Sequence, residues 1–183
     1  MNKVVDIKDK KSLQNAAGVL KRGGILVFPT DTVYGIGCLL NEKAIRKLYK
    51  IKNRPLNQPT AVLMNGKDIP RKLLSEYNKY PKGRVTIVVD ARNLNIKFPD
   101  LILKNNKIGV RIPDHPWLEE LIDNVGPIVA SSANKKGERP PKSFEEVNDE
   151  ILKKADLVIE THEKLSGKPS SVYDIEENKV IRS

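Results

Sequence analysis

The sequence predicts a single α/β domain over residues 1–183, with a twisted sheet of parallel and antiparallel strands flanked by helices. Apolar runs of strand length alternate with amphipathic helical segments, and no repeat period connects them. No stretch rich in Gly and Ser divides the chain, and 183 residues suit one domain with a substantial core. Because 39% of the residues are hydrophobic and 31% are charged, the composition is that of a globular protein, not of a disordered or membrane-embedded one.

The first half of the chain carries clear start and stop signals. Residues 4–7 form an apolar first strand, and the helical pattern that follows ends at the pair Gly23-Gly24. Residues 25–28 form a buried strand that ends at Pro29, because proline cannot donate to a strand ladder. Asn41 is the predicted N-cap of the next helix. The other elements expected here are an extended segment over 38–40, a turn over 53–59, strands over 60–64 and 85–89, and a short helix at Leu73 and Leu74.

The second half contains a long polar interval followed by regular elements. Residues 91–106 predict a surface excursion whose one candidate apolar contact is Leu101-Ile102-Leu103. A strand over 107–112 precedes Asp114, the predicted N-cap of a helix. Ser143 and Glu146 have the spacing of a capping box, which predicts the start of another helix. The remaining predicted strands are 128–130, 157–159, 172–175 and 180–181.

The charge balance permits a polyanionic partner without identifying one. The 33 Lys and Arg residues exceed the 23 Asp and Glu residues, and the net charge of +10 attracts nucleotides and nucleic acids. Many of the lysines lie along helices, where charge also serves as a solvated face. Only 5% of the residues are aromatic, which leaves no obvious stacking platform for single strands.

The sequence favours a cytoplasmic protein. Its charged N-terminus is unlike a signal peptide, and no apolar run approaches the roughly 20 residues that span a bilayer. Cys38 is the only cysteine, which excludes an internal disulfide and fits a reducing compartment. Its apolar surroundings predict a core position and not a nucleophile.

The segment VFPTDTVYGIG, residues 27–37, carries a dense group of polar side chains directly after a strand. Three hydroxyls and a carboxylate fall within five positions, from Thr30, Asp31, Thr32 and Tyr34. Two glycines let the backbone approach a neighbour closely. We interpret this segment as a binding loop for a small polar ligand. The alternative is a turn in which the Thr and Asp side chains bond their own backbone.

Polar clusters follow the ends of several predicted strands or helices. Since ligands of open α/β sheets collect beyond strand ends, we predict that these clusters converge on one site. Lys52 and Arg54 stand one residue apart in an irregular turn, where both can face one polyphosphate; taken alone, they fit surface charge better. The five clusters are the binding loop, Lys52-x-Arg54, Thr86, Arg111 and Ser132-x-Asn134.

Arg111 alternates with apolar residues on its strand, which places it on the face opposite theirs. A guanidinium held there can clamp a carboxylate through two parallel hydrogen bonds, or it can form a structural salt bridge. Ser132 and Asn134 can bind phosphate oxygens with little bulk. The chain has no G-x-x-x-x-G-K-[ST] phosphate loop, and His115 and His162 lie far apart, so neither a catalytic triad nor a His-rich metal site is predicted.

Taken in order along the chain, these motifs resemble those of the YrdC-like threonylcarbamoyl-AMP synthases. Each motif alone is weak, but the ordered set is specific and extends from about Ile25 to Arg182. The resemblance implies a YrdC/RibB-like fold with a basic concave face, in the short form of the family that lacks an extra C-terminal domain. The motifs are PTDTVYGIG, Lys52-x-Arg54 with Pro55, Thr86, GVRIPDHP, Ser132-x-Asn134 with Gly137, SSVYD at 170–174 and the terminal Ile181-Arg182.

This resemblance implies an enzyme that makes threonylcarbamoyl-adenylate and pyrophosphate from L-threonine, bicarbonate and ATP, for the t6A modification of tRNA. It implies Mg²⁺ held mainly through the ATP phosphates, without protein ligands, and it implies tRNA and the tRNA threonylcarbamoyl-transferase complex as partners. Lys52 and Arg54 are the implied catalytic residues, because an anionic carbamate attacking ATP needs positive charge more than an acid or base. The implied ATP-binding residues are Lys52, Arg54, Thr86, Ser132, Asn134 and Arg182, and the implied threonine-binding residues are Thr30, Thr32, Tyr34, Arg111, Ala130 and Ser170.

The chain departs from the family pattern at three places. Lys82-Gly83-Arg84 replaces a loop that carries two prolines, and we expect it to be looser or to touch phosphate or tRNA. Leu63 stands where many longer members carry a histidine near the threonine, and Lys107 replaces a small hydroxyl residue.

The sequence leaves two other functions open. One is a double-stranded RNA or tRNA-binding module without synthase activity. The other is a carbamoyl-transfer domain like that of hydrogenase maturation proteins, against which the single cysteine argues.

Overall fold

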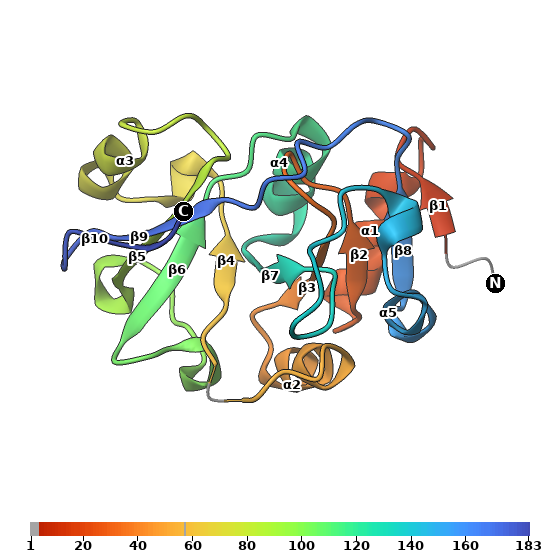
Figure 1. Cartoon of the computed structure of the whole chain (residues 1–183), viewed down its shortest axis with the longest axis horizontal. Coiled ribbons are helices and arrows are strands. Elements are labelled where there is room, and N and C mark those ends of the chain that lie inside the picture. The colour runs from red at the N-terminus through yellow and green to blue at the C-terminus, as the bar shows by residue number, and fades with distance from the viewer. Residues whose placement is uncertain (1–3, 57) are drawn as a thin grey trace.

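The computed structural model describes residues 4–56 and 58–183, whose ten strands belong to one mixed sheet flanked by helices (Figure 1). The predicted α/β class is therefore confirmed. Residues 1–3 of the charged N-terminus and residue 57 of the predicted turn lie outside the described part. The sheet order is β1-β8-β2-β3-β7-β4-β6-β5-β9-β10. The strands are β1 (Val4–Asp6), β2 (Leu26–Phe28), β3 (Gly35–Leu39), β4 (Ala61–Leu63), β5 (Val85–Asp90), β6 (Lys107–Arg111), β7 (Ile128–Ser132), β8 (Leu157–Glu160), β9 (Ser171–Asp174) and β10 (Lys179–Arg182).

The helices cover the two faces of the sheet unequally. Leu20 of α1 and Leu121 of α4 pack in one cluster against Phe28 of β2. Val27, the neighbouring residue of β2, points into a second cluster on the opposite face, as the period of two in a strand requires. Helices α2, α3 and α5 contribute to this second cluster. The helices are α1 (Ser12–Lys21), α2 (Glu42–Ile51), α3 (Arg71–Tyr77), α4 (Pro116–Val125) and α5 (Asp149–Lys154).

Several local predictions are confirmed. The side chain of Asn41 accepts a hydrogen bond from the Ala44 amide (3.1 Å) and caps α2. Cys38 is fully buried in β3, and burial raises the pKa of its thiol to about 12. A thiol with such a pKa carries little thiolate at neutral pH, which supports a core role.

Two predicted helix caps are wrong. His115 is the N-cap of α4, and Asp114 instead faces Lys82 at 3.5 Å. The proposed capping box at Ser143 and Glu146 forms only a 3-10 turn over Phe144–Glu146, because the Glu146 carboxylate accepts from the amide of residue 142. Helix α5 starts later, where Asn148 accepts from the amide of residue 150.

The prediction of a surface excursion over residues 91–106 is wrong at Leu94 and Phe98, while the apolar contact expected around Ile102 is confirmed. Leu94, Phe98 and Ile102 are buried and join the main core cluster. These apolar residues recur every fourth position inside a polar interval, and the surrounding charge concealed that spacing.

None of the described helices is long and apolar enough to span a membrane.

Candidate functional site

A cavity of about 600 Å³ opens on the sheet face that carries α1 and α4, over strands that these helices leave bare. Alternate residues of neighbouring strands form its floor. Arg111 of β6 lies between Leu63 of β4 and Thr86 of β5 in the strand register, so the three side chains stand side by side. Gly109 and Ala130 leave the floor hollow because they carry little or no side chain.

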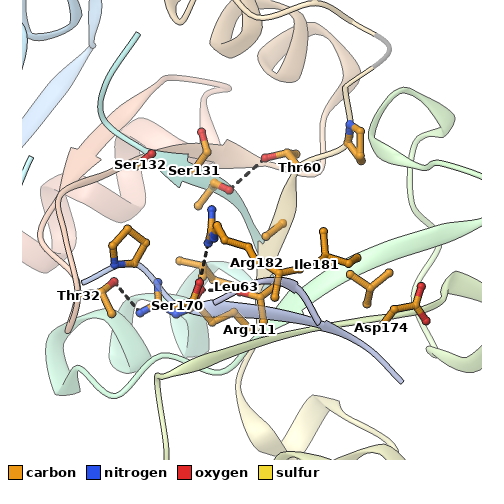
Figure 2. Close-up of a pocket in the computed structure, with 18 of the residues that line it drawn as sticks. Thr32, Thr60, Leu63, Arg111, Ser131, Ser132, Ser170, Asp174, Ile181 and Arg182 are labelled. Carbon is orange, nitrogen blue, oxygen red and sulfur yellow. Dashed lines mark hydrogen bonds between the residues drawn. The ribbon is translucent and has the colours of Figure 1, made fainter. Parts of the chain in front are cut away.

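The rim of the cavity comes from segments far apart in the sequence (Figure 2). Arg182 in β10 donates from Nη2 to the carbonyl of Ser170 at 2.7 Å, which fixes the last strand beside the floor. The hydroxyls of Ser170 and Thr86 are bonded at 2.8 Å. On another side, Thr60 donates to the carbonyl of Ala130 at 3.1 Å. The first and the last of the predicted motifs therefore line the same cavity, as Thr30 and Arg182 show.

The cavity is lined by more basic than acidic side chains. The acidic residues, Asp174 and Glu177, are both engaged by Lys107, at 2.8 and 2.9 Å. The acidic residues of the lining are therefore balanced by one lysine, and the other basic residues give the cavity an excess of positive charge. The basic lining residues are Arg54, Lys104, Lys107, Arg111, Lys179 and Arg182.

Of the two roles that its sequence context left open, Arg111 shows the structural salt bridge, and the protein engages two of its three guanidinium nitrogens. Its side chain is only 10% exposed and forms an ion pair with Asp31 at 2.7 Å, so a structural salt bridge exists. The same Nη2 atom donates to Thr32 Oγ1 at 2.9 Å, and Nε donates to the carbonyl of Gly83 at 3.2 Å. No hydrogen bond joins Nη1 to any residue that the structure describes, and Arg111 lines the cavity. One nitrogen of the guanidinium is therefore available to a ligand.

Lys52 lies behind the cavity wall and meets the Ser132-x-Asn134 pair there. Its side chain nitrogen donates to the carbonyls of Ser132 and Asn134, the second at 2.7 Å. The residue is 5% exposed. Burial, assisted by the neighbouring charge of Arg54, lowers the pKa of Lys52 to about 7.

Arg54 reaches the cavity itself. Its guanidinium donates to the carbonyl of Pro59 and lies 5.4 Å from the centre of the Tyr49 ring. Arg54 and Lys52 therefore face the same wall from its two sides. Lys52 contacts the Ser132-x-Asn134 pair, and Arg54 and Ser132 line the same cavity, so the four residues lie in one region, but only Arg54 and Ser132 reach the cavity.

Most of the predicted site residues line the cavity, and three do not. Tyr34 is fully buried in the core, where its hydroxyl accepts from the Thr161 amide at 2.9 Å, so its position does not support contact with threonine. Asn134 turns its amide nitrogen to the carbonyls of residues 135 and 138, at 2.9 and 2.8 Å. Lys52 is the third. The predicted residues that line the cavity are Thr30, Thr32, Arg54, Thr86, Arg111, Ala130, Ser132, Ser170 and Arg182.

The binding loop is at once a cavity wall and a self-bonded turn. Thr30 Oγ1 donates to the carbonyl of Val33 at 2.7 Å and is bonded to Thr32 Oγ1 at 2.9 Å. Thr32 in turn accepts from Arg111. The local bonds of the turn alternative are therefore present, and they orient Thr32 toward Arg111. The ligand interpretation stays a prediction.

The departures from the family pattern have clear structural roles. Lys82 pairs with Glu119 at 2.8 Å, and Arg84 donates to the Ser166 hydroxyl at 2.7 Å. These contacts do not support the expectation of a looser loop, and residues 82–84 do not line the cavity, so contact with phosphate there is not supported either. Contact with tRNA stays a prediction. Leu63 lines the cavity beside Arg111 and gives that region an apolar wall.

Sequence reasoning missed Thr60 and the group around Lys107. Thr60 is buried and lies just before β4. Its position between Pro59 and a strand could have indicated a site residue. The cluster of Lys107 with Asp174 and Glu177 joins residues far apart in the chain and carries no local signal.

The two histidines lie in different surroundings. His115 is partly buried, its Nδ1 has no partner among the described residues, and desolvation lowers its pKa. His162 stands near Asp6 and Glu160, with ligand atoms that all lie within 4.8 Å of one another. This group sits at the β1–β8 end of the sheet, at the opposite end from β9 and β10 (Figure 1). Among the described residues no further feature indicates an ion there.

The fold and the cavity define an α/β protein with a site for anions. A bare sheet face carries one buried arginine at its centre and further arginines at its rim, next to hydroxyl groups, and this combination suits a carboxylate beside a phosphate chain. The chain belongs to the Sua5/YciO/YrdC family, since the family model, described as "Telomere recombination", matches residues 18–183.

Relatives from several organisms support this membership. A protein of Methanocaldococcus jannaschii, provisionally named a threonylcarbamoyl-AMP synthase, is 34% identical over 197 residues, which cover 98% of this chain and 91% of the relative. The structure of Pyrococcus abyssi Sua5 complexed with L-threonine matches with a TM-score of 0.83 at 27% identity, and it covers 97% of this chain. This chain spans only 55% of that Sua5 chain. Escherichia coli YciO, at 23% identity and a TM-score of 0.82, covers 98% of this chain and 92% of its own and supports the fold.

Proposed function

We propose that this chain is a threonylcarbamoyl-AMP synthase, which converts L-threonine, bicarbonate and ATP into threonylcarbamoyl-AMP and pyrophosphate. The observation that carries the proposal is the position of Arg111 on the cavity floor, with Arg54 and Arg182 on the rim. The family membership and the names of the relatives agree with this reaction. An RNA-binding module without synthase activity is the less favoured function, because the relatives are named for the synthase.

The amino-acid end of the site is the region around Arg111. Its free Nη1 donates to the threonine carboxylate, and Thr32 and Ser170 offer hydroxyls at the same depth in the cavity. The apolar side chain of Leu63 packs against the aliphatic part of the amino acid. P. abyssi Sua5 is a relative whose structure holds L-threonine, which supports threonine as the substrate here.

The phosphate end of the site is the region of Arg54, Ser132 and Arg182. Arg54 donates to the carbonyls of residues 58 and 59 through Nε and Nη2, which leaves Nη1 for phosphate oxygens, and Ser132 supplies a hydroxyl of little bulk. Lys52 holds the turn that carries Ser132 and adds its charge from behind the wall. Removing charge here is expected to cost more in catalysis than in folding, because the attacking and the attacked groups are both anionic.

The reaction needs positioning and charge more than an acid or base. The amine of threonine and bicarbonate condense to a carbamate with loss of one water, and the carbamate oxygen then attacks the α-phosphorus of ATP while pyrophosphate leaves. Because both the carbamate and the product anhydride are labile in water, the reaction requires that solvent be kept from the bound substrates.

Magnesium is expected to bind mainly through the ATP phosphates. The acidic residues of the lining, Asp174 and Glu177, are already paired with Lys107, so the cavity offers little free carboxylate to a cation. When bound to ATP, Mg²⁺ neutralises charge on the phosphates. The product is then passed to the tRNA threonylcarbamoyl-transferase complex and tRNA in the cytoplasm.

The test is pyrophosphate release by the purified protein with ATP, bicarbonate and Mg²⁺, in the presence and absence of L-threonine. Threonine-dependent release supports the synthase. Salt-sensitive binding of RNA without such release would support the RNA-binding module instead. Release that requires carbamoyl phosphate in place of bicarbonate and threonine would support a carbamoyl-transfer domain.

A further inference from the structure

The guanidinium of Arg111 is held by the protein on all but one of its nitrogens. An arginine side chain has five N–H groups, one on Nε and two on each Nη atom. Nε is bonded to Gly83, and the two N–H groups of Nη2 are accounted for by Asp31 and Thr32. A two-nitrogen clamp on a substrate carboxylate would have to displace one of these partners, so the ligand is left with Nη1.

Asp31 is the charged member of this holding group and is itself fixed. Its side chain is 9% exposed. Gly83 has a φ of +73°, and a Cβ built at that residue would lie 2.3 Å from Asp31 Oδ2. The carboxylate is therefore packed directly against the glycine backbone and has little room to swing away.

The two carboxylate oxygens of Asp31 differ in their hydrogen bonding. Oδ2 is buried and has no partner among the described residues, which is unfavourable for a carboxylate. Only Oδ1 is used, and it is used on Arg111. The burial of the Asp31 carboxylate is explained if this group balances the charge of the buried Arg111 guanidinium and orients it.

We propose that Asp31 is a positioning residue that aims Nη1 of Arg111 into the cavity, so that the carboxylate of the amino-acid substrate is received by that nitrogen. The inference deepens the proposed function and rests on it. Asp31 does not line the cavity and acts through Arg111. In this arrangement the orientation of the guanidinium is fixed before the substrate binds, so binding loses little side-chain entropy of Arg111.

The variants separate charge, hydrogen bonding and packing. Asp31→Ala removes the acceptor, and Asp31→Asn keeps an acceptor at the position of Oδ1. Asp114→Ala is the matched control, since Asp114 also borders Gly83 but pairs with Lys82 and not with Arg111. If Asp31→Ala does not fold, Asp31→Ser takes its place as the variant whose side chain is too short to reach Nη2.

The first measurement needs no substrate. NMR of ¹⁵N-labelled arginine side chains reports rotation of each guanidinium, with the Arg111 signal assigned by its loss in Arg111→Ala. We expect restricted rotation of Arg111 in the native protein, in Asp31→Asn and in Asp114→Ala, and free rotation in Asp31→Ala. Equal restriction in Asp31→Ala would overturn the inference, whatever the enzyme does.

The second measurement is calorimetry of L-threonine and of ATP binding to the same variants. We expect Asp31→Ala to weaken threonine binding by about tenfold or more, as loss of a charged hydrogen bond does, while ATP binding changes by less than about threefold. Asp31→Asn should stay within about threefold of the native protein for both ligands. Tighter threonine binding by Asp31→Ala would show that Asp31 competes with threonine for Arg111. Equal weakening of threonine and ATP binding would show that Asp31 only maintains the fold. Either result overturns the inference.

The two proposals fail separately. A native protein that binds no threonine but holds Arg111 rigid through Asp31 would contradict the proposed function and leave the positioning intact. A native synthase in which Arg111 stays rigid without Asp31 would contradict the positioning alone.

Discussion

Lys52 places an amine in a buried setting where the proton is weakly held. Burial and the nearby charge of Arg54 lower its pKa to about 7, against 10.5 for a free side chain. Between these values the unfolded chain binds the proton more tightly than the folded protein, so the Lys52 contribution to stability rises with pH through that window. A polyphosphate reverses this balance, because an anion near the amine favours its charged form.

ATP binding should therefore take up a proton. At pH 8 we expect uptake of about one proton for each ATP bound, and a fall in ATP affinity as the pH rises from 7 to 9, because Lys52 must be recharged first. Calorimetry in two buffers of different ionisation enthalpy measures the uptake. Lys104→Met, which removes another cavity lysine, should retain it, and Lys52→Met should abolish it. Unchanged uptake in Lys52→Met would assign the proton to another group.

Charge removal at either residue of the Lys52-x-Arg54 pair should impair catalysis strongly. We expect Arg54→Ala and Lys52→Ala each to lower kcat on the order of one hundredfold or more, by analogy with the loss of a charge-stabilising donor. Steady-state pyrophosphate release measures the effect, with Arg92→Ala as a control because Arg92 pairs with Asp90 on the surface. A change of less than about tenfold would show that the pair does not stabilise the transition state.

At the scale of single elements, the stability that the N-cap of α2 contributes can be compared with that of Ser143, where a cap was predicted and is absent. Asn41→Ala should lower the free energy of unfolding by about 1 kcal/mol, because its side chain caps the Ala44 amide. Ser143→Ala should change it by less than about 0.5 kcal/mol, because Ser143 makes no cap bond. Urea unfolding compares the two variants, and equal losses would contradict the assignment of caps.

The turn at Gly83 couples backbone geometry to the site. Gly83→Ala combines a positive φ with a Cβ 2.3 Å from Asp31 Oδ2, whereas Gly126→Ala has a positive φ and open space around its Cβ. We expect both variants to lose about 1 kcal/mol of stability or more from backbone strain, and Gly83→Ala to lose more. Only Gly83→Ala should also weaken threonine binding. Thermal unfolding and calorimetry measure both effects, and equal behaviour of the two variants would show that Asp31 is not packed against Gly83.

At the scale of the whole molecule, the cavity joins strands from the middle and one end of the sheet. A ligand that contacts β6, β7 and β10 together should stabilise the domain as a unit, by about 2.7 kcal/mol at one hundred times its Kd. For a chain of this size that corresponds to a rise in Tm of about 5–10 °C. Differential scanning fluorimetry with L-threonine measures it. Arg111→Ala should show no rise, and a similar rise in that variant would place the ligand elsewhere.

Much of the architecture was predictable because it depends on local patterns. Apolar runs, Asn41 and the prolines identified nearly every strand and helix between residues 4 and 90. The two errors in helix caps fell where a side chain had a competing partner. Asp114 faces Lys82, and Glu146 bonds to the chain before it, so neither side chain was free for the predicted cap.

The site was predictable as a set of residues but not as a set of contacts. The placement of polar clusters at strand ends correctly predicted that they meet. It did not predict that Lys52 lies behind the wall, that Tyr34 is a core residue, or that Asp31 rather than solvent faces Arg111.

The sequence by itself determined the alternation of strands and helices, the basic character of the chain and the list of groups able to bind anions, because each depends on residue type and spacing. Only the tertiary structure decided which of these groups reach the cavity and which partners hold them. Those outcomes depend on strand order and register, which bring residues from distant parts of the chain to one sheet face, and no local pattern in the sequence specifies that order.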